Sequence, residues 1–263
     1  MENYKKQLVL AKDKTDLKHF AKRQETIFQL ENAKSDSFNI SGPTSCHYIR
    51  TSNKLFDLYF EDEDYEEALD IAKEIFDIIQ QNDDILLKSE SIINLGLAYL
   101  KNGNITKAKE VAEIYSFDDT NPKYPSYCMF KASLLEVFNK QEEQLHYLKK
   151  AYEYAVKLKY KDEDISNILL SVALFYEKNK LYKQAYSIYL EIFNKSKILV
   201  SSLTDEERYS FLLRLANLAI INNEKEFAFD ILVKSKKAMI EKFKPNHPLL
   251  KIINKALDST ENK

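Results

Sequence analysis

Residues 94–108 read NLGLAYLKNGNITKA. Gly96, Tyr99 and Ala108 stand where the two helices of an antiparallel pair would meet, and the polar residues 101–104 would form the turn. A glycine lets the second helix approach the first, Ala108 allows the same approach from the other side, and Tyr99 fills the space between them. This stretch therefore predicts a helical hairpin.

The same spacing recurs along the chain, with a tyrosine nine residues before an alanine at Tyr59 and Ala68 and again at Tyr176 and Ala185. A later copy has Ala219 in place of the tyrosine. A copy between them is the weakest, because Leu135 and Gln144 replace both residues. The resulting helix pairs are expected at residues 44–82, 86–117, 124–160, 164–200 and 204–243, with a further helix at 248–258.

This pattern resembles the tetratricopeptide repeat, whose first helix carries Leu-Gly-x-x-Tyr and whose second helix carries a small residue twelve positions after the glycine. The resemblance covers residues 44–258. It implies an all-α fold, a right-handed solenoid of about five helix pairs with an N-terminal helix and a C-terminal capping helix. The period exceeds the roughly 34 residues of the standard repeat, so the helices or loops are expected to be longer.

Residues 1–40 lie outside the repeat and are expected to form a separate amphipathic segment before a repeat domain at 41–263. Leu10, Leu17, Phe20 and Ile27 draw an apolar stripe along a helix, and the first 23 residues carry a surplus of basic side chains. Such a helix could pack on the first repeat as an end cap, lie on a membrane or grip a partner helix. A polar linker is predicted at residues 35–43.

The composition excludes several classes of protein. The net charge of -2 provides no overall field for nucleic acid, and no apolar run is long enough to span a bilayer. Three glycines in 263 residues disfavour sheet hairpins and phosphate loops. Two cysteines, Cys46 and Cys128, cannot build a disulfide framework, which predicts a cytoplasmic protein.

No motif for catalysis, a cofactor or a metal is visible. The histidines are scattered, and the adjacent Cys46 and His47 would point about 100° apart on a helix. The chain is therefore expected to be no enzyme and to hold no cofactor and no metal. One alternative stays open, in which Gln24 or Gln29 stimulates phosphoryl hydrolysis.

The resemblance implies that the first helix of each pair lines a concave groove. Asparagine amides there can donate to and accept from a peptide backbone at once, while arginine and lysine can hold a carboxylate. The predicted peptide-binding residues are Arg50, Asn53, Lys54, Asn94, Asn167, Arg214 and Asn217. Asp57 and Lys101 occupy further groove positions.

The long repeat and the number of pairs also resemble the tetratricopeptide sensors of Gram-positive bacteria that bind peptide pheromones. Forty residues are too few for the N-terminal domains of those proteins, so the resemblance implies an isolated sensor domain. The leading interpretation is a regulatory module that holds a short peptide or protein segment in the groove, as in quorum sensing. The alternative is an adaptor that joins partners through its outer surface or its N-terminal helix, and a homodimer also stays open.

Overall fold

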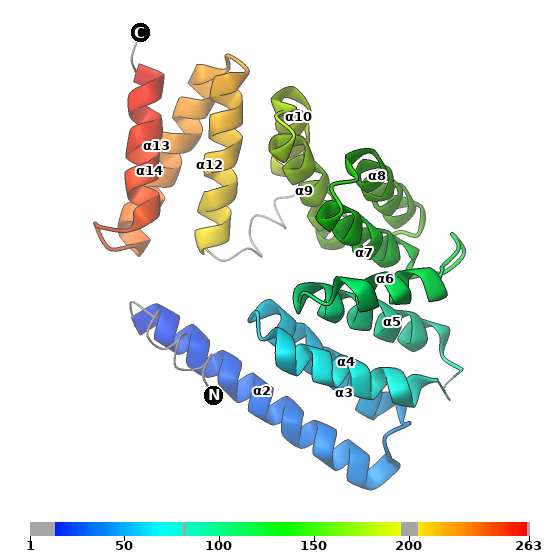
Figure 1. The fold of residues 1–263 in the computed structure, drawn as a ribbon. Coiled ribbons are helices and arrows are strands. Elements are labelled where there is room, and N and C mark those ends of the chain that lie inside the picture. Colours follow the sequence, from blue (N-terminus) through cyan, green and yellow to red (C-terminus); the bar gives the residue numbers. More distant parts are fainter. Residues whose placement is uncertain (1–13, 81–82, 196–204, 262–263) are drawn as a thin grey trace. The chain divides into compact units, whose positions relative to one another are not determined.

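The computed structural model describes residues 14–80, 83–195 and 205–261. All regular secondary structure in these ranges is α-helical, which confirms the predicted fold class. The helices divide into two compact units, Met1–Lys140 and Gln141–Lys263, shown in Figure 1. None of the described helices is both long and apolar enough to cross a membrane.

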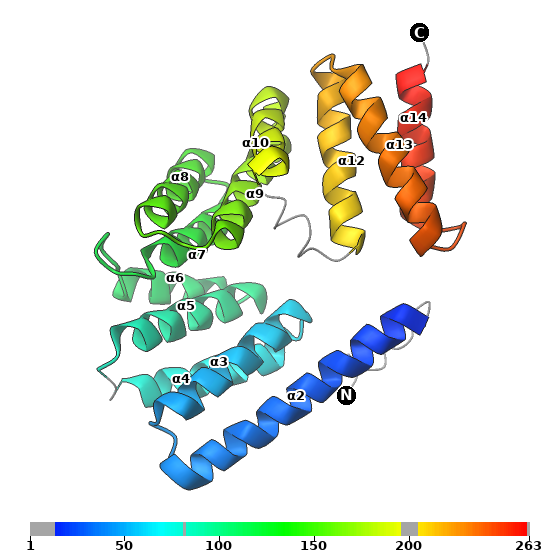
Figure 2. The same cartoon turned by 180° about the vertical axis from the view of Figure 1, so that it is seen from behind.

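Unit 1 contains α2 (Lys14–Ser41), α3 (Cys46–Glu61), α4 (Tyr65–Ile79), α5 (Ile85–Lys101), α6 (Ile105–Ile114) and α7 (Tyr124–Val137). Helices that follow one another in the chain pack together, and α5 also contacts both α3 and α7. The first helices of successive pairs therefore adjoin one another within this unit. Figure 2 shows the same helices from behind.

Unit 2 contains α8 (Gln141–Lys157), α9 (Asp162–Lys178), α10 (Tyr182–Lys195), α12 (Asp205–Ile221), α13 (Lys225–Lys242) and α14 (Pro248–Glu261). One cluster of buried side chains in this unit includes the fully buried Tyr189, Leu215, Leu232 and Ile253. Ile253 belongs to α14, which packs on both α12 and α13. The predicted capping helix is thus confirmed.

The small residues of the repeat lie where close packing requires them. Ala68, Ala108, Ala185 and Ala228 are completely buried, which confirms their predicted role. The structure gives Gly96 a partner that the sequence analysis did not predict. A Cβ atom at Gly96 would lie 2.4 Å from the Phe130 ring of α7, so the glycine admits the first helix of the next pair.

Six of the turns between helices share one backbone geometry. In each of these six, one residue has positive φ, and the next amide bonds to the carbonyl five residues earlier, as from Asn104 N to Tyr99 O at 2.9 Å. This is the Schellman ending of a helix. The positive-φ residues of these turns are Glu63, Gly103, Asn139, Lys159, Lys180 and Asn223.

The N-terminal helix is longer than predicted. The linker predicted at residues 35–43 is wrong for most of its length, because α2 continues through Ser41. Its packing on α3 agrees with the end-cap interpretation. Leu10 and the basic residues before position 14 lie outside the described residues.

Candidate functional site

Two asparagines meet at the centre of the first-helix surface in unit 1. Asn53 on α3 and Asn94 on α5 hold corresponding positions, and Asn94 Nδ2 donates to Asn53 Oδ1 at 3.5 Å. They were predicted to face solvent, but Asn53 is only 5% exposed and Asn94 only 8%. The structure therefore brings these two predicted residues into contact between α3 and α5.

Glu90 joins the asparagines to α7. It lies one turn before Asn94 on α5, and it accepts from Asn53 Nδ2 at 3.4 Å. Its other carboxylate oxygen pairs with Lys123 Nζ at 3.1 Å. Asn121 donates to Ser89 Oγ at 2.9 Å and so ties the loop before α7 to α5, which places Lys123 beside Glu90.

Asp57 completes the group from α3, one turn after Asn53. Its carboxyl is reached by solvent, and it makes no hydrogen bond or ion pair with a described residue. Partial burial, followed by the negative charges of Glu90 and Glu61, raises the pKa of Asp57 to about 6, while Lys123 opposes the shift. We call Asn53, Asp57, Glu90 and Asn94 the acid–amide patch.

Arg50 and Lys54 lie on the same helix as Asn53. Both side chains are exposed, and neither forms an ion pair with a described residue. Arg50 stands three residues before Asn53, which places it on the same helix face. These two predicted residues remain available to a carboxylate, as does the exposed Lys101 at the end of α5.

In unit 2, the predicted residue Arg214 is already paired within the protein. Arg214 on α12 holds the protein's own Glu177, with Nη1 at 2.9 and 3.0 Å from the two carboxylate oxygens. Glu177 also accepts from the buried Tyr189 hydroxyl at 3.3 Å. The carboxylate that Arg214 was expected to take from a ligand is thus supplied from α9.

Asn167 on α9 and Asn217 on α12 are exposed. Neither side chain makes a hydrogen bond with a described residue. Both amides are therefore free to bond a ligand, but nothing in the described part of unit 2 gathers them into a patch like that of unit 1.

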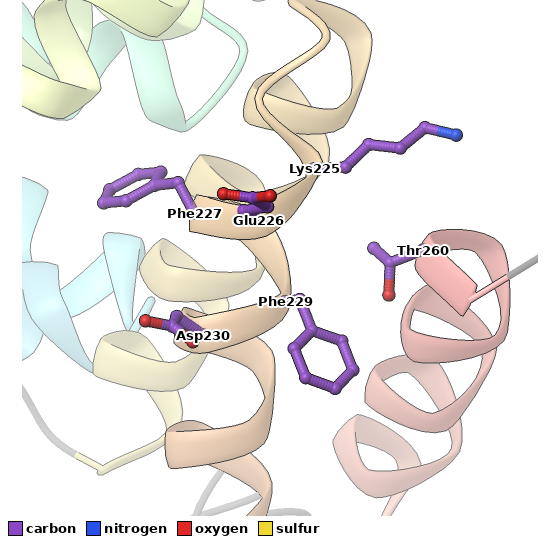
Figure 3. Close-up of a pocket in the computed structure, with 6 residues that line it drawn as sticks. All are labelled: Lys225, Glu226, Phe227, Phe229, Asp230 and Thr260. Carbon is purple, nitrogen blue, oxygen red and sulfur yellow. The ribbon is translucent and has the colours of Figure 1, made fainter.

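A pocket of about 640 Å³ lies elsewhere, between the start of α13 and the end of α14. In Figure 3, Phe229 points toward α14 and Phe227 points the other way. The lining residues are Lys225, Glu226, Phe227, Phe229, Asp230 and Thr260. None of the predicted peptide-binding residues belongs to it, and its charged residues carry both signs.

Glu90 and Lys123 were missed by the sequence analysis. Glu90 had a detectable signal, because it precedes the predicted Asn94 by four residues and so shares its helix face. Lys123 had none, since its position depends on the path of the loop after α6. No group of three or more histidine, cysteine, aspartate or glutamate residues in the described ranges is placed to hold a metal ion.

Comparison with protein families and with curated proteins finds no match. Solved structures do match. The crystal structure of BtubC (BKLC) from P. vanneervenii is similar with a TM-score of 0.62 and 15% identity, covering 86% of this chain and 94% of that one. A tetratricopeptide repeat protein from Parabacteroides merdae is similar with a TM-score of 0.52 and 18% identity, covering 94% and 81%. The fold is of the tetratricopeptide type.

At these identities the likeness concerns the tetratricopeptide fold alone. Such folds stack helix pairs and expose the first helices along one surface. The acid–amide patch lies on that surface. The choice of ligand therefore depends on the side chains themselves.

Proposed function

We propose that this protein is a non-catalytic regulatory module that binds a short peptide or an extended protein segment against the first helices of its repeats. The observation that carries the proposal is the meeting of Asn53 and Asn94 at corresponding positions of adjacent helices. Their hydrogen bonds, at 3.4 and 3.5 Å, are long for amides. Each amide keeps capacity for a peptide backbone, which needs a donor and an acceptor together.

Side chains without a bonded partner among the described residues offer further contacts within each unit taken by itself. Arg50 and Lys54 in unit 1 suit a carboxylate, and Asn167 and Asn217 in unit 2 suit a backbone. Arg214 contributes through its pair with Glu177, which a ligand carboxylate would have to displace. The resemblance to pheromone sensors points to signalling peptides as natural ligands, and Cys46 and Cys128, which form no disulfide, support a cytoplasmic site of action.

Thermal unfolding against pools of short random peptides tests the proposal. A ligand at 100 times its Kd adds about 2.7 kcal/mol to the free energy of unfolding, so a binding pool should raise the Tm. The shift should shrink in Asn94→Ala and in Asn217→Ala. Asn254→Ala, which removes an exposed amide from α14, is the matched control and should keep the full shift. A Tm unmoved by every pool would argue against peptide binding.

The adaptor alternative also has an observation in its favour. On α2, Phe28 is 63% exposed and Ile40 is 83% exposed, and exposed apolar side chains are common at protein interfaces. Phe28→Ser with Ile40→Ser should abolish capture of protein partners if α2 is the docking element. Capture that survives both changes would remove α2 from this role.

A further inference from the structure

One side of α13 carries a row of apolar side chains that the described helices leave exposed. Val233 lies four residues after Phe229, and Ile240 lies seven residues after Val233, which places all three along the same side of the helix. All three are exposed, although α14 packs on α13. Figure 3 shows Phe229 pointing toward α14, and Phe229 also lines the pocket of about 640 Å³. We call these three residues the α13 stripe.

The equivalent position in the preceding helix pair is covered. Ala185 of α10 and Ala228 of α13 hold the same place in the repeat, so Tyr186 corresponds to Phe229. Tyr186 is only 6% exposed, whereas Phe229 is 37% exposed. The hydroxyl of Tyr186 donates at 2.7 Å to Glu224, the residue directly before α13, so the start of the next second helix provides the cover. Among the described residues no second helix follows α14, and Phe229 therefore lacks this cover.

Contacts between successive second helices show that the cover is a helix. Phe193 of α10 packs edge-on against Phe227 of α13, with the ring centroids 6.1 Å apart. In unit 1, Phe76 of α4 packs in the same way against Tyr115 at the end of α6, at 5.7 Å. Phe193 and Phe76 both stand eight residues after the alanine of their repeat, and Lys236 holds this position on α13. The place beyond α13 is thus one that a further helix can occupy.

Lysines beside the α13 stripe determine which charge a matching helix would carry. Lys236 and Lys237 lie three or four residues from both Val233 and Ile240, so they share the same side of α13. Neither lysine forms an ion pair or a side-chain hydrogen bond with a described residue. An exposed apolar surface bordered by charge is typical of an interaction site, and two uncompensated cations favour a partner with carboxylates.

We propose that the α13 stripe binds an acidic amphipathic helix of a partner protein, in the place where a second helix after α14 would lie. Apolar side chains of this helix, spaced three and four residues apart, would contact Phe229, Val233 and Ile240. Its carboxylates would pair with Lys236 and Lys237. The surface belongs to a second helix and not to the first helices that we propose to hold an extended peptide, so it is a further binding activity.

Selection from a displayed library of helical peptides tests the inference. The peptides, of about 20 residues so that they form helices, share one apolar stripe and carry either glutamate or lysine beside it. The full chain should enrich peptides with glutamate. Lys236→Glu with Lys237→Glu should enrich peptides with lysine instead. The matched control is Lys149→Glu with Lys150→Glu, which reverses an adjacent lysine pair on α8 of the same unit and should select as the wild type does.

A selected peptide then measures the apolar contact. Val233→Ser should weaken its binding about tenfold. Val156→Ser changes a comparably exposed valine of α8 in the same unit and should leave the Kd unchanged. Because both valines are exposed, thermal unfolding of the two variants should match that of the wild type.

Three results would overturn the inference. Selection of no helix, or of helices without a preference for glutamate, would do so and would leave the proposed peptide binding by the first helices untouched. A Kd that Val233→Ser does not change would mean that the selected helix binds elsewhere. Sedimentation of the chain alone tests for a second copy, since a dimer that Val233→Ser dissociates would assign the α13 stripe to self-association.

Discussion

At the scale of single residues, several turns place a residue other than glycine in the left-handed backbone conformation, which costs free energy. Lys180 adopts a φ of 60°, in a left-handed region that costs about 1 kcal/mol for a side chain with a Cβ atom. Gly103 meets the same requirement without that cost. Asn139 and Asn223 tolerate it better than lysine, because asparagine favours this region.

Lys180→Gly should therefore stabilise unit 2. We expect a gain of about 0.5–1 kcal/mol, because relief of the left-handed strain exceeds the added flexibility of the unfolded chain. Thermal unfolding would detect a rise of a few degrees in Tm. The control, Lys183→Gly within α10, should lower stability by about 1 kcal/mol. A lower Tm for Lys180→Gly would show that the turn is not strained.

At Gly96, in contrast to Lys180, the chain already has a glycine, and replacing it should be unfavourable. Phe130 is 1% exposed, so its ring cannot move aside for a Cβ atom at 2.4 Å. Gly96→Ala should destabilise the protein, because overpacking costs about 1–3 kcal/mol and the better helix propensity of alanine returns only about 1 kcal/mol. Denaturant unfolding measures the loss.

A smaller ring partner tests this account of Gly96. Phe130→Leu alone should be destabilising through lost packing, but it should cost less in the Gly96→Ala background, where it makes room for the new methyl group. Strictly additive free energies of unfolding would contradict a direct contact between the two positions.

The raised pKa of Asp57 predicts that the stability of the folded protein depends on pH. Its pKa of about 6 in the folded protein lies above the ordinary value of 3.8, so the folded state binds more protons than the unfolded chain between these two values. The contribution of Asp57 to stability therefore falls as the pH rises through this window. Asp57→Asn should unfold at a higher temperature than the wild type at neutral pH and at about the same temperature below pH 4. A difference that persists in acid would assign the effect to something other than the charge.

At the scale of helices, the repeat was predictable because its packing rules are local. A tyrosine and an alanine nine residues apart mark the contact within one pair, so the pairs could be found from the sequence. Contacts between pairs could not be found in this way. The packing of Gly96 on Phe130, the pairing of Arg214 with Glu177 and the position of Lys123 all join residues about one repeat apart, for which the pattern gives no rule. Asn53 and Asn94 were found by their positions in the repeat, but their burial was not.

Helix α2 makes several polar contacts through the side chains that the structure describes. Among the apolar side chains of α2 that the structure describes, Ile27 is the buried one. Its ion pairs reach α3 through Arg23, to Glu61 and Asp62, and α4 through Lys34, to Glu74 at 2.6 Å. Ion pairs of this partly exposed kind are screened by salt, so α2 should be the element of unit 1 that releases most easily.

Hydrogen exchange would test the docking of α2. Ile27→Ala should speed exchange of the α2 amides, because removing a buried isoleucine side chain costs about 2–5 kcal/mol, and about 1 M salt should increase the effect. Phe28→Ala changes the exposed neighbour and should leave the exchange rates of α2 unchanged. Equal protection in all three proteins would mean that α2 is held by other contacts.

At the scale of the whole molecule, the chain forms two compact units, and each has its own consequence for function. Unit 1 contains the acid–amide patch. In unit 2, Arg214 forms an ion pair with Glu177 of the same unit. Unit 2 also has a continuous cluster of buried side chains. In repeat proteins most contacts join neighbouring elements, so opening can be confined to one part of the chain. We therefore expect that the binding proposed for the patch can be altered without unfolding unit 2.

The Gly96→Ala variant makes this separation measurable. Because its clash lies between α5 and α7, we expect faster hydrogen exchange in the helices of unit 1, above all at residues 85–101 and 124–137. Residues 205–221 and 248–261 of unit 2 should keep wild-type protection, since the buried cluster to which they belong is made, among the described residues, of side chains of residues 169–257. Lys180→Gly supplies the reciprocal control and should slow exchange in unit 2 alone. Equal acceleration across both units in Gly96→Ala would instead mean that the chain unfolds as one cooperative body, and that a ligand bound at the patch would stabilise unit 2 as strongly as unit 1.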